Sequence, residues 1–158
     1  MRRPWMRRGA LVALAVVGLS ACSPQLPEGI DASVLTQAVG RSIGSPSTCV
    51  VIADAKGKLV WRGGGYITCS RNLPDCEGAQ TTAEDLVKAN LGKPARFLSC
   101  PSAPGAANTV GWAIGPVPTG EGKPDRHLTY VAVMEGERAL PGLEIKDRVE
   151  RAFRKAGF

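Results

Sequence analysis

Four cysteines in the middle of the chain, Cys49, Cys69, Cys76 and Cys100, limit how its strands can be arranged. None of them belongs to a Cys-x-x-Cys pair, and the single histidine, His127, has no partner at the spacing of metal ligands. These spacings do not favour a zinc site or a thioredoxin-like redox motif. In an oxidising compartment, an even number of cysteines is instead typical of disulfide bonds.

The spacing of the cysteines suggests how they pair. The segment 70–75 is rich in turn-forming residues, so we expect a short-range bond between Cys69 and Cys76. Cys49 would then pair with Cys100 over a long span. In the chain-entropy model, the two bonds would contribute about 2.5 and about 4 kcal/mol respectively. We therefore predict a structural role for all four cysteines.

The start of the chain has the layout of an export signal. Four arginines (Arg2, Arg3, Arg7 and Arg8) precede an apolar run at 10–19, and small residues follow it. The apolar run is much shorter than the roughly 20 residues that cross a hydrocarbon core, so we predict a cleaved signal peptide at 1–21. Its removal lowers the formal net charge from +6 to +2, which leaves no argument for nucleic-acid binding.

The residues at the expected cleavage point carry a more specific signal. Leu19-Ser20-Ala21-Cys22 resembles the lipobox of bacterial lipoprotein precursors, in which cysteine follows small residues three places after an aliphatic one. The resemblance implies that Cys22 is diacylglycerylated and that its new amino group is acylated, and several acyl chains anchor a protein stably in a membrane. The alternative is an ordinary signal peptide that happens to be followed by cysteine.

The same resemblance gives an expected location. Ser23, rather than aspartate, follows the cysteine, which in enterobacterial lipoproteins is compatible with sorting to the outer membrane. We therefore expect the protein to be anchored in the bacterial cell envelope and to face the periplasm. Residues 22–30 contain two prolines and no periodic pattern, so we predict a lipidated cysteine and tether there, and a single domain at 31–158.

The domain has alternating helix and strand patterns. Asp31 can cap a first helix that ends near Gly40 or Gly44, and Thr81 with Glu84 fits a capping box for a second. A last helix has apolar residues at helical spacing from 145 to 156. Strands are expected at 49–53 and 58–62, joined as a hairpin through a turn at 54–57, and at 66–69, 96–100, 110–115 and 128–134.

These elements predict the fold class. Leu128 to Met134 is apolar on both faces, which is typical of a central strand. The order of elements predicts an α+β domain with a mostly antiparallel sheet of about five strands and packed N-terminal, middle and C-terminal helices.

Two protein families have a similar outline. The order and length of the elements resemble the roadblock and profilin-like group of small binding and scaffold domains. The run Gly111-Trp112-Ala113-Ile114-Gly115, the strand 130–134 and the last helix resemble the sheet region of serine β-lactamases and penicillin-binding proteins. That chemistry requires Ser-x-x-Lys and a Lys-Thr-Gly variant, and the chain contains neither motif, so we exclude it.

Other enzyme classes have little support in the sequence. The chain contains no Gly-x-Ser-x-Gly motif, and a Ser-His-Asp hydrolase would have to use His127, the single histidine. The carboxylate pairs at 84–85 and at Glu135 with Glu137 are interpreted as solvated residues rather than as a catalytic acid and base. We expect neither a cofactor nor a metal.

By elimination, the leading hypothesis is a noncatalytic module that binds an envelope protein or a cell-wall component. Its expected surface surrounds Trp61, Tyr66 and Trp112. A small-ligand-binding domain and a hydrolase remain alternatives.

Overall fold

The computed structural model describes residues 25–158. The predicted signal peptide and the lipobox with Cys22 lie outside the described residues, as does the side chain of Tyr66. The described chain forms, in order, α1 (Ala32–Ile43), β1 (Thr48–Ala53), β2 (Leu59–Gly64), α2 (Tyr66–Ser70), β3 (Leu73–Pro74), β4 (Gln80–Thr81), α3 (Ala83–Ala89), β5 (Arg96–Pro101), β6 (Thr109–Pro116), β7 (Thr129–Gly136) and α4 (Gly142–Lys155).

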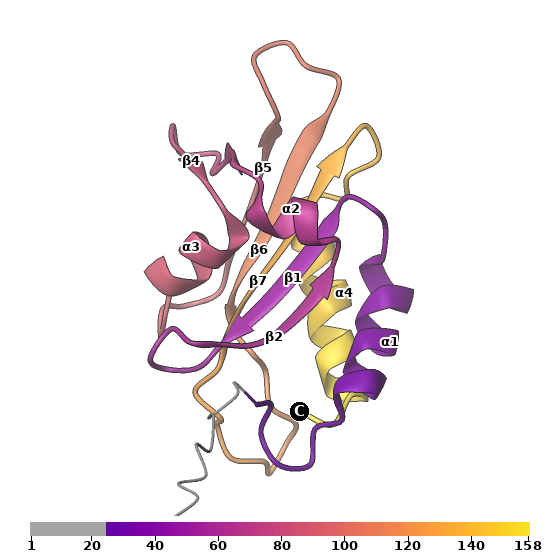
Figure 1. Cartoon of the computed structure of the whole chain (residues 1–158), viewed down its shortest axis with the longest axis vertical. Coiled ribbons are helices and arrows are strands. Elements are labelled where there is room, and N and C mark those ends of the chain that lie inside the picture. The colour runs from indigo at the N-terminus through magenta and orange to yellow at the C-terminus, as the bar shows by residue number, and fades with distance from the viewer. Residues whose placement is uncertain (1–24) are drawn as a thin grey trace, which may run out of the picture.

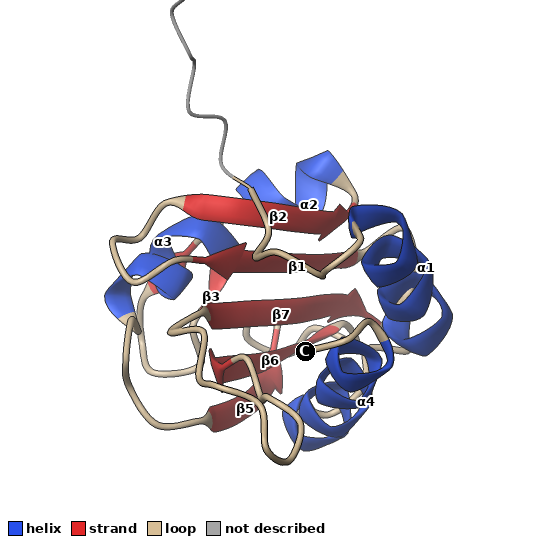
Figure 2. Cartoon of the chain, turned by 90° about the horizontal axis from the view of Figure 1, so that it is seen from below, coloured by secondary structure: helices blue, strands red, loops and turns tan. Residues whose placement is uncertain are grey.

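The centre of the molecule is a five-stranded antiparallel sheet with the strand order β2-β1-β7-β6-β5. Helices α1 and α4 lie on one face, and the short helices α2 and α3 lie on the other (Figures 1 and 2). The predicted α+β class, the sheet of about five strands and the central place of the strand at 128–134 are therefore confirmed.

The sheet separates two apolar clusters. Tyr130 and Ala132 of β7 face the side of α1 and α4, while Val131 and Val133 face α2 and α3. Both faces of this strand are buried, as the sequence pattern predicts. On the α4 side, Phe153 packs edge-on against Tyr130, with ring centroids 5.1 Å apart. Burial raises the pKa of the Tyr130 hydroxyl, and the charge of Glu150, which accepts its hydrogen bond, adds to the effect.

Local sequence signals explain where α1 begins and where the β1–β2 hairpin turns. The Asp31 carboxylate accepts hydrogen bonds from the amides of Ser33 and Val34, so the predicted cap is confirmed. The hydrogen bond from the Ser33 hydroxyl is the largest cause of the lowered pKa of Asp31, followed by the two amides. The predicted hairpin is also confirmed: β1 pairs with β2, and Gly57 in the turn has a φ of +81°.

The prediction of a strand at 66–69 is wrong, because the chain leaves the sheet before it. Gly64 has a φ of +88° and lies so close to Thr48 that an added Cβ would meet the Thr48 carbonyl oxygen at 2.1 Å. The chain then turns into α2, which folds back over β1. The cap of α3 is also one residue later than predicted, since the Thr82 hydroxyl, rather than that of Thr81, accepts from the Asp85 amide.

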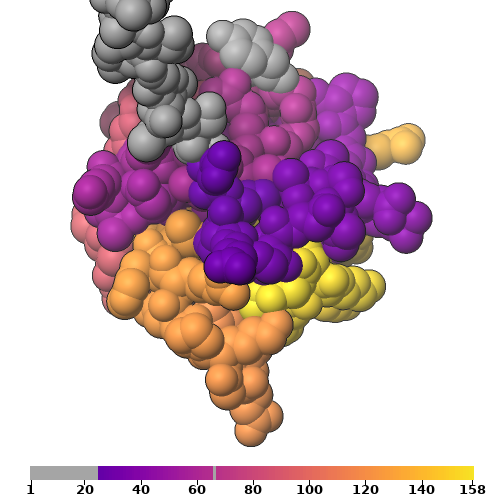
Figure 3. All heavy atoms as spheres, turned by 60° about the horizontal axis from the view of Figure 1, so that its bottom comes forward, coloured from indigo at the N-terminus to yellow at the C-terminus, as the bar shows by residue number. Residues whose placement is uncertain are grey.

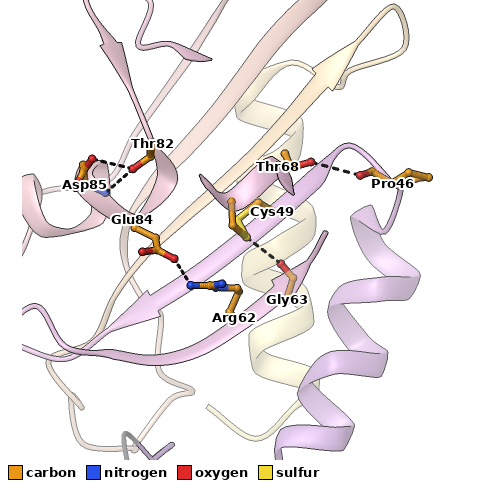
Figure 4. The surroundings of a disulfide bond; sticks show 9 residues. Pro46, Cys49, Arg62, Gly63, Thr68, Thr82, Glu84 and Asp85 are labelled. Carbon is orange, nitrogen blue, oxygen red and sulfur yellow. Dashed lines mark hydrogen bonds and ion pairs between the residues drawn. A yellow bond between two sulfur atoms is a disulfide. The ribbon is translucent and has the colours of Figure 1, made fainter. Parts of the chain in front are cut away.

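The predicted disulfide pairing is wrong as well. The structure joins Cys49 to Cys69, with Cα atoms 5.1 Å apart, and Cys76 to Cys100, with Cα atoms 5.5 Å apart. Cys49 lies in β1 and Cys100 in β5, with β7 and β6 between them. Three inter-strand spacings amount to about 14 Å, twice the largest Cα separation that a disulfide spans. The first bond instead ties α2 to the sheet (Figure 4), and the second ties the β3–β4 hairpin to it.

The packed domain begins earlier than the predicted boundary at residue 31. Leu26 packs against the core, and Ile30 is buried in it. The Arg126 guanidinium donates to the Glu28 carbonyl oxygen at 2.9 Å, which holds this segment against the connection between β6 and β7. The end of the predicted tether is thus part of the domain. Within residues 25–158, no helix has the length and apolarity that would cross a membrane.

Candidate functional site

The two tryptophans of the predicted binding surface are buried on opposite faces of the sheet. Trp61 packs with the α1–α4 cluster, and Trp112 is fully buried in the α2–α3 cluster. The Trp112 indole donates to the Pro74 carbonyl oxygen at 2.8 Å. The prediction that they form an exposed surface is therefore wrong. Tyr66 is the first residue of α2, and the position of its side chain is not described.

A glycine within two positions of each tryptophan could have indicated burial. An added Cβ on Gly63 would meet the Trp61 ring at 2.2 Å, and one on Gly111 would meet the Leu140 carbonyl oxygen at 2.3 Å. In both places the glycine makes room for close packing, which is a feature of interior positions.

Three of the four carboxylates in the pairs have structural partners. Glu84 forms an ion pair with Arg62, and Asp85 bonds to the Thr82 hydroxyl that caps α3 (Figure 4). The Glu135 side chain is 8% exposed and forms an ion pair with Arg71, so it is not the solvated residue that the sequence suggests. A buried carboxylate with a charged partner is satisfied, and this arrangement does not resemble an acid–base pair facing a substrate.

A recess with a volume of about 550 Å³ lies at one end of the sheet. Three connections meet there: the turn between β1 and β2, the segment between α3 and β5, and the segment between β6 and β7. Its lining consists of Ala55, Leu91, Gly92, Lys93, Pro94, Pro116, Asp125, His127, Leu128 and Thr129. This volume is within the range of about 300–1,000 Å³ that is usual for small-molecule sites.

The floor of this recess, which we call the β6–β7 recess, is buried and mostly apolar. Leu128 and Thr129 are buried at the start of β7, and the Gly92 amide donates to the Thr129 hydroxyl at 3.4 Å. Asn90, just before the recess, is also buried, and its side-chain amide donates to the Leu86 carbonyl oxygen at 2.7 Å. The Gly92 bond joins the segment after α3 to β7, and the Asn90 bond closes the end of α3.

Charged groups lie at the rim. The His127 amide donates to the Asp125 carboxylate at 2.7 Å, and the His127 imidazole lies 3.5 Å from the other oxygen of that carboxylate. His127 has a φ of +52°, a conformation that is uncommon for residues other than glycine. Lys93, in the segment between α3 and β5, adds a cation to the lining. The rim can therefore contact a polar ligand group of either sign.

The arrangement has features of a binding site. Among the described residues that line the recess there is no serine or cysteine, and the Thr129 hydroxyl already accepts a backbone hydrogen bond. The His127 side chain is 77% exposed, whereas a catalytic base is positioned against its substrate in a site that excludes water. An apolar floor with a few polar rim groups is typical of a ligand site.

Of the residues at this recess, the sequence indicates a role only for His127, as the base that a Ser-His-Asp hydrolase would have to use. Pro116 and Thr129 lie at the ends of β6 and β7, and most of the other lining residues lie in connections, which carry no signal of their own before the fold brings them together. Comparison of the chain with protein-family models, with curated proteins and with solved structures finds no match.

Proposed function

We propose that the chain is a cell-envelope lipoprotein, anchored through acyl chains on Cys22, whose noncatalytic domain binds a small ligand in the β6–β7 recess. The observation that carries the binding function is the recess itself, with its apolar floor and its charged rim at Lys93, Asp125 and His127. The ligand class that fits is a small molecule, free or part of the cell wall, with both an apolar and a polar portion.

The two disulfides support an extracytoplasmic location. Such bonds persist in oxidising compartments such as the bacterial periplasm and are rare in the cytosol. Both bonds hold short elements that have few other means of staying on the sheet, namely the five-residue helix α2 and the two-residue strands β3 and β4. A fold that depends on two disulfides is therefore consistent with the proposed extracytoplasmic location.

A second candidate function is a scaffold that binds another envelope protein. Within the described chain, the outer edge of β5 pairs with no strand, and Phe97 on this strand is 48% exposed. An exposed strand edge can accept an extended peptide from a partner. Cross-linking in intact cells tests this candidate, and a partner whose capture is abolished by Phe97→Asp would favour it over the recess.

The anchor is tested by membrane fractionation of Cys22→Ala. We expect the substituted protein in the soluble envelope fraction and the unchanged protein in the membrane fraction, because acylation requires the Cys22 thiol. Equal membrane retention of both proteins would contradict lipid anchoring.

The ligand site is tested by native mass spectrometry of protein purified from the envelope under mild conditions. Ala55→Trp places a large ring at the recess from an exposed turn and leaves the core untouched. Ala107→Trp, in the exposed turn between β5 and β6 at the other end of the sheet, is the matched control. We expect a small bound molecule on the unchanged and control proteins and little on Ala55→Trp. Equal occupancy of all three would refute the site.

A further inference from the structure

Little chain separates the proposed anchor from the folded domain. Leu26 already packs against the core, and Ile30 is buried in it, so only residues 23–25 lie between Cys22 and the first packed side chain. The sequence alone predicts a free tether up to residue 30. The structure therefore removes more than half of the expected reach.

The segment 26–30 is held in place by several contacts. The Ile30 amide donates to the Pro27 carbonyl oxygen at 3.1 Å, and Arg126 donates to the Glu28 carbonyl oxygen at 2.9 Å. Ile30 also lies beside Gly157, after the end of α4. These bonds fix the point where the tether leaves the domain.

Covalent geometry gives the maximum reach. An extended chain spans about 3.3–3.6 Å per residue, so the Cα atoms of Cys22 and Leu26 are at most about 14 Å apart. The polar layer on each side of a bilayer is about 5–8 Å thick, because the hydrocarbon core measures about 30 Å of a total of about 40–45 Å. Leu26 therefore lies within about 10 Å of the lipid surface. A tether that ended at Asp31 would have reached about 30 Å.

We propose that the domain rests directly on the phospholipid surface through one defined face, which we call the anchor face. It consists of residues 26–30, the connection 117–128 between β6 and β7, and the end of α4 at 156–158. Figure 3 shows these segments together on one side of the molecule. The proposal rests on the proposed lipid anchor at Cys22 and adds an orientation to it.

Contacts within the anchor face make it one unit. The Gly120 amide donates to the Phe158 carbonyl oxygen at 3.2 Å, and the Lys123 ammonium group donates to the Gly157 carbonyl oxygen at 2.7 Å. The cations Lys123 and Arg126 are offset by acidic residues in the same segments, so the tether rather than net charge determines the orientation. Such a mixed surface is compatible with zwitterionic headgroups.

The orientation also places the proposed ligand site. Asp125 and His127 belong to the anchor face and line the β6–β7 recess. The connection between β5 and β6 lies at the opposite end of the sheet, far from the lipid surface (Figure 1). A ligand would thus enter the recess next to the headgroups.

Hydrogen exchange measured by mass spectrometry tests the orientation. Full-length lipidated protein in vesicles of phosphatidylethanolamine and phosphatidylglycerol is compared with soluble Cys22→Ala protein. We expect amide exchange in 118–126 to slow several-fold on the vesicles and exchange in 102–107, at the far end, to be unchanged. A Gly/Ser insertion of about twenty residues after Ser23 adds about 25 Å of root-mean-square reach, and we expect it to abolish the slowing while the protein stays on the membrane.

The outcomes separate the orientation from the anchor. Retention on the vesicles with no slowing in 118–126 would overturn the orientation and leave the anchor intact. Slowing that persists in the insertion variant would overturn the short tether as its cause. Failure of the unchanged protein to be lipidated and retained would overturn the anchor, and the orientation with it.

Discussion

The disulfide connectivity has a direct test in two double variants. Cys49→Ala/Cys69→Ala and Cys76→Ala/Cys100→Ala each remove one bond of the structure and leave the other intact. In a Cys22→Ala background, the unfolded and unreduced protein then has no free thiol. The pairing expected from sequence spacing would leave two free thiols in each variant.

The structure also predicts which variant loses more stability. The bonded residues are 20 positions apart in the first pair and 24 in the second, so the chain-entropy model gives similar losses of about 3.3 and about 3.5 kcal/mol. Cys49 and Cys69 are fully buried, however, and removing their sulfur atoms leaves a cavity that costs about 1 kcal/mol more. Cys76 and Cys100 are partly exposed and leave no comparable cavity.

Thiol titration and urea unfolding provide the two measurements. We expect no thiol in either double variant, two after reduction, and a larger fall in the free energy of unfolding for Cys49→Ala/Cys69→Ala despite its shorter loop. Two free thiols before reduction would refute the connectivity. A larger loss for Cys76→Ala/Cys100→Ala would refute the argument from burial.

The packing of the sheet and of α1 gives three further predictions. Trp112→Ala should lower the free energy of unfolding by about 3–5 kcal/mol, and Trp112→Phe should lower it by about 1–2 kcal/mol because the Pro74 carbonyl oxygen loses its indole donor. Urea unfolding measures both losses, and an unchanged midpoint for Trp112→Ala would contradict the burial of Trp112. Gly142→Ala places a Cβ 2.5 Å from carbonyl oxygens of both β5 and β6 and should lower the free energy of unfolding by about 3 kcal/mol. Gly40→Ala, in open space within α1, should raise it by about 0.5–1 kcal/mol. Equal midpoints of urea unfolding for the two variants would contradict the close approach at Gly142. Because the pKa of Asp31 is lowered in the folded protein, its carboxylate stabilises the fold at pH values above the ordinary 3.8, and this contribution is lost as the pH falls through the folded-state pKa. The difference in Tm between the unchanged protein and Asp31→Ala should therefore narrow below pH 3.8. A difference in Tm that stays constant with pH would contradict the cap.

Much of the fold follows from signals that are local in sequence. The cap at Asp31, the turn at Gly57 and the two-faced apolar pattern of 129–134 each fix an element through neighbouring residues. Together they specify the N-terminal helix, the hairpin and the central strand. The α+β class then follows from the order of elements.

The errors have a common physical origin in contacts between distant segments. Cys69 pairs with Cys49 only because the chain turns at Gly64 and lies back over β1, and nothing in residues 66–69 themselves announces that turn. Trp61 and Trp112 are buried because helices cover both faces of the sheet, and a strand pattern does not show which faces are covered. The β6–β7 recess could not be predicted from the sequence for the same reason, because it forms where three connections that are distant in sequence come together.

The two faces of the sheet differ in how they are held, and this suggests an order of maturation. The α1–α4 face is closed by two helices of 12 and 14 residues with large apolar stripes, and its cluster contains no cysteine among residues 25–158, whereas both disulfides lie on the face of α2 and α3. Helices of five and seven residues are too short to persist without packing or covalent support. We therefore expect the half with α1 and α4 to fold before any disulfide has formed, and the half with α2 and α3 to be completed only after both thiol pairs are oxidised.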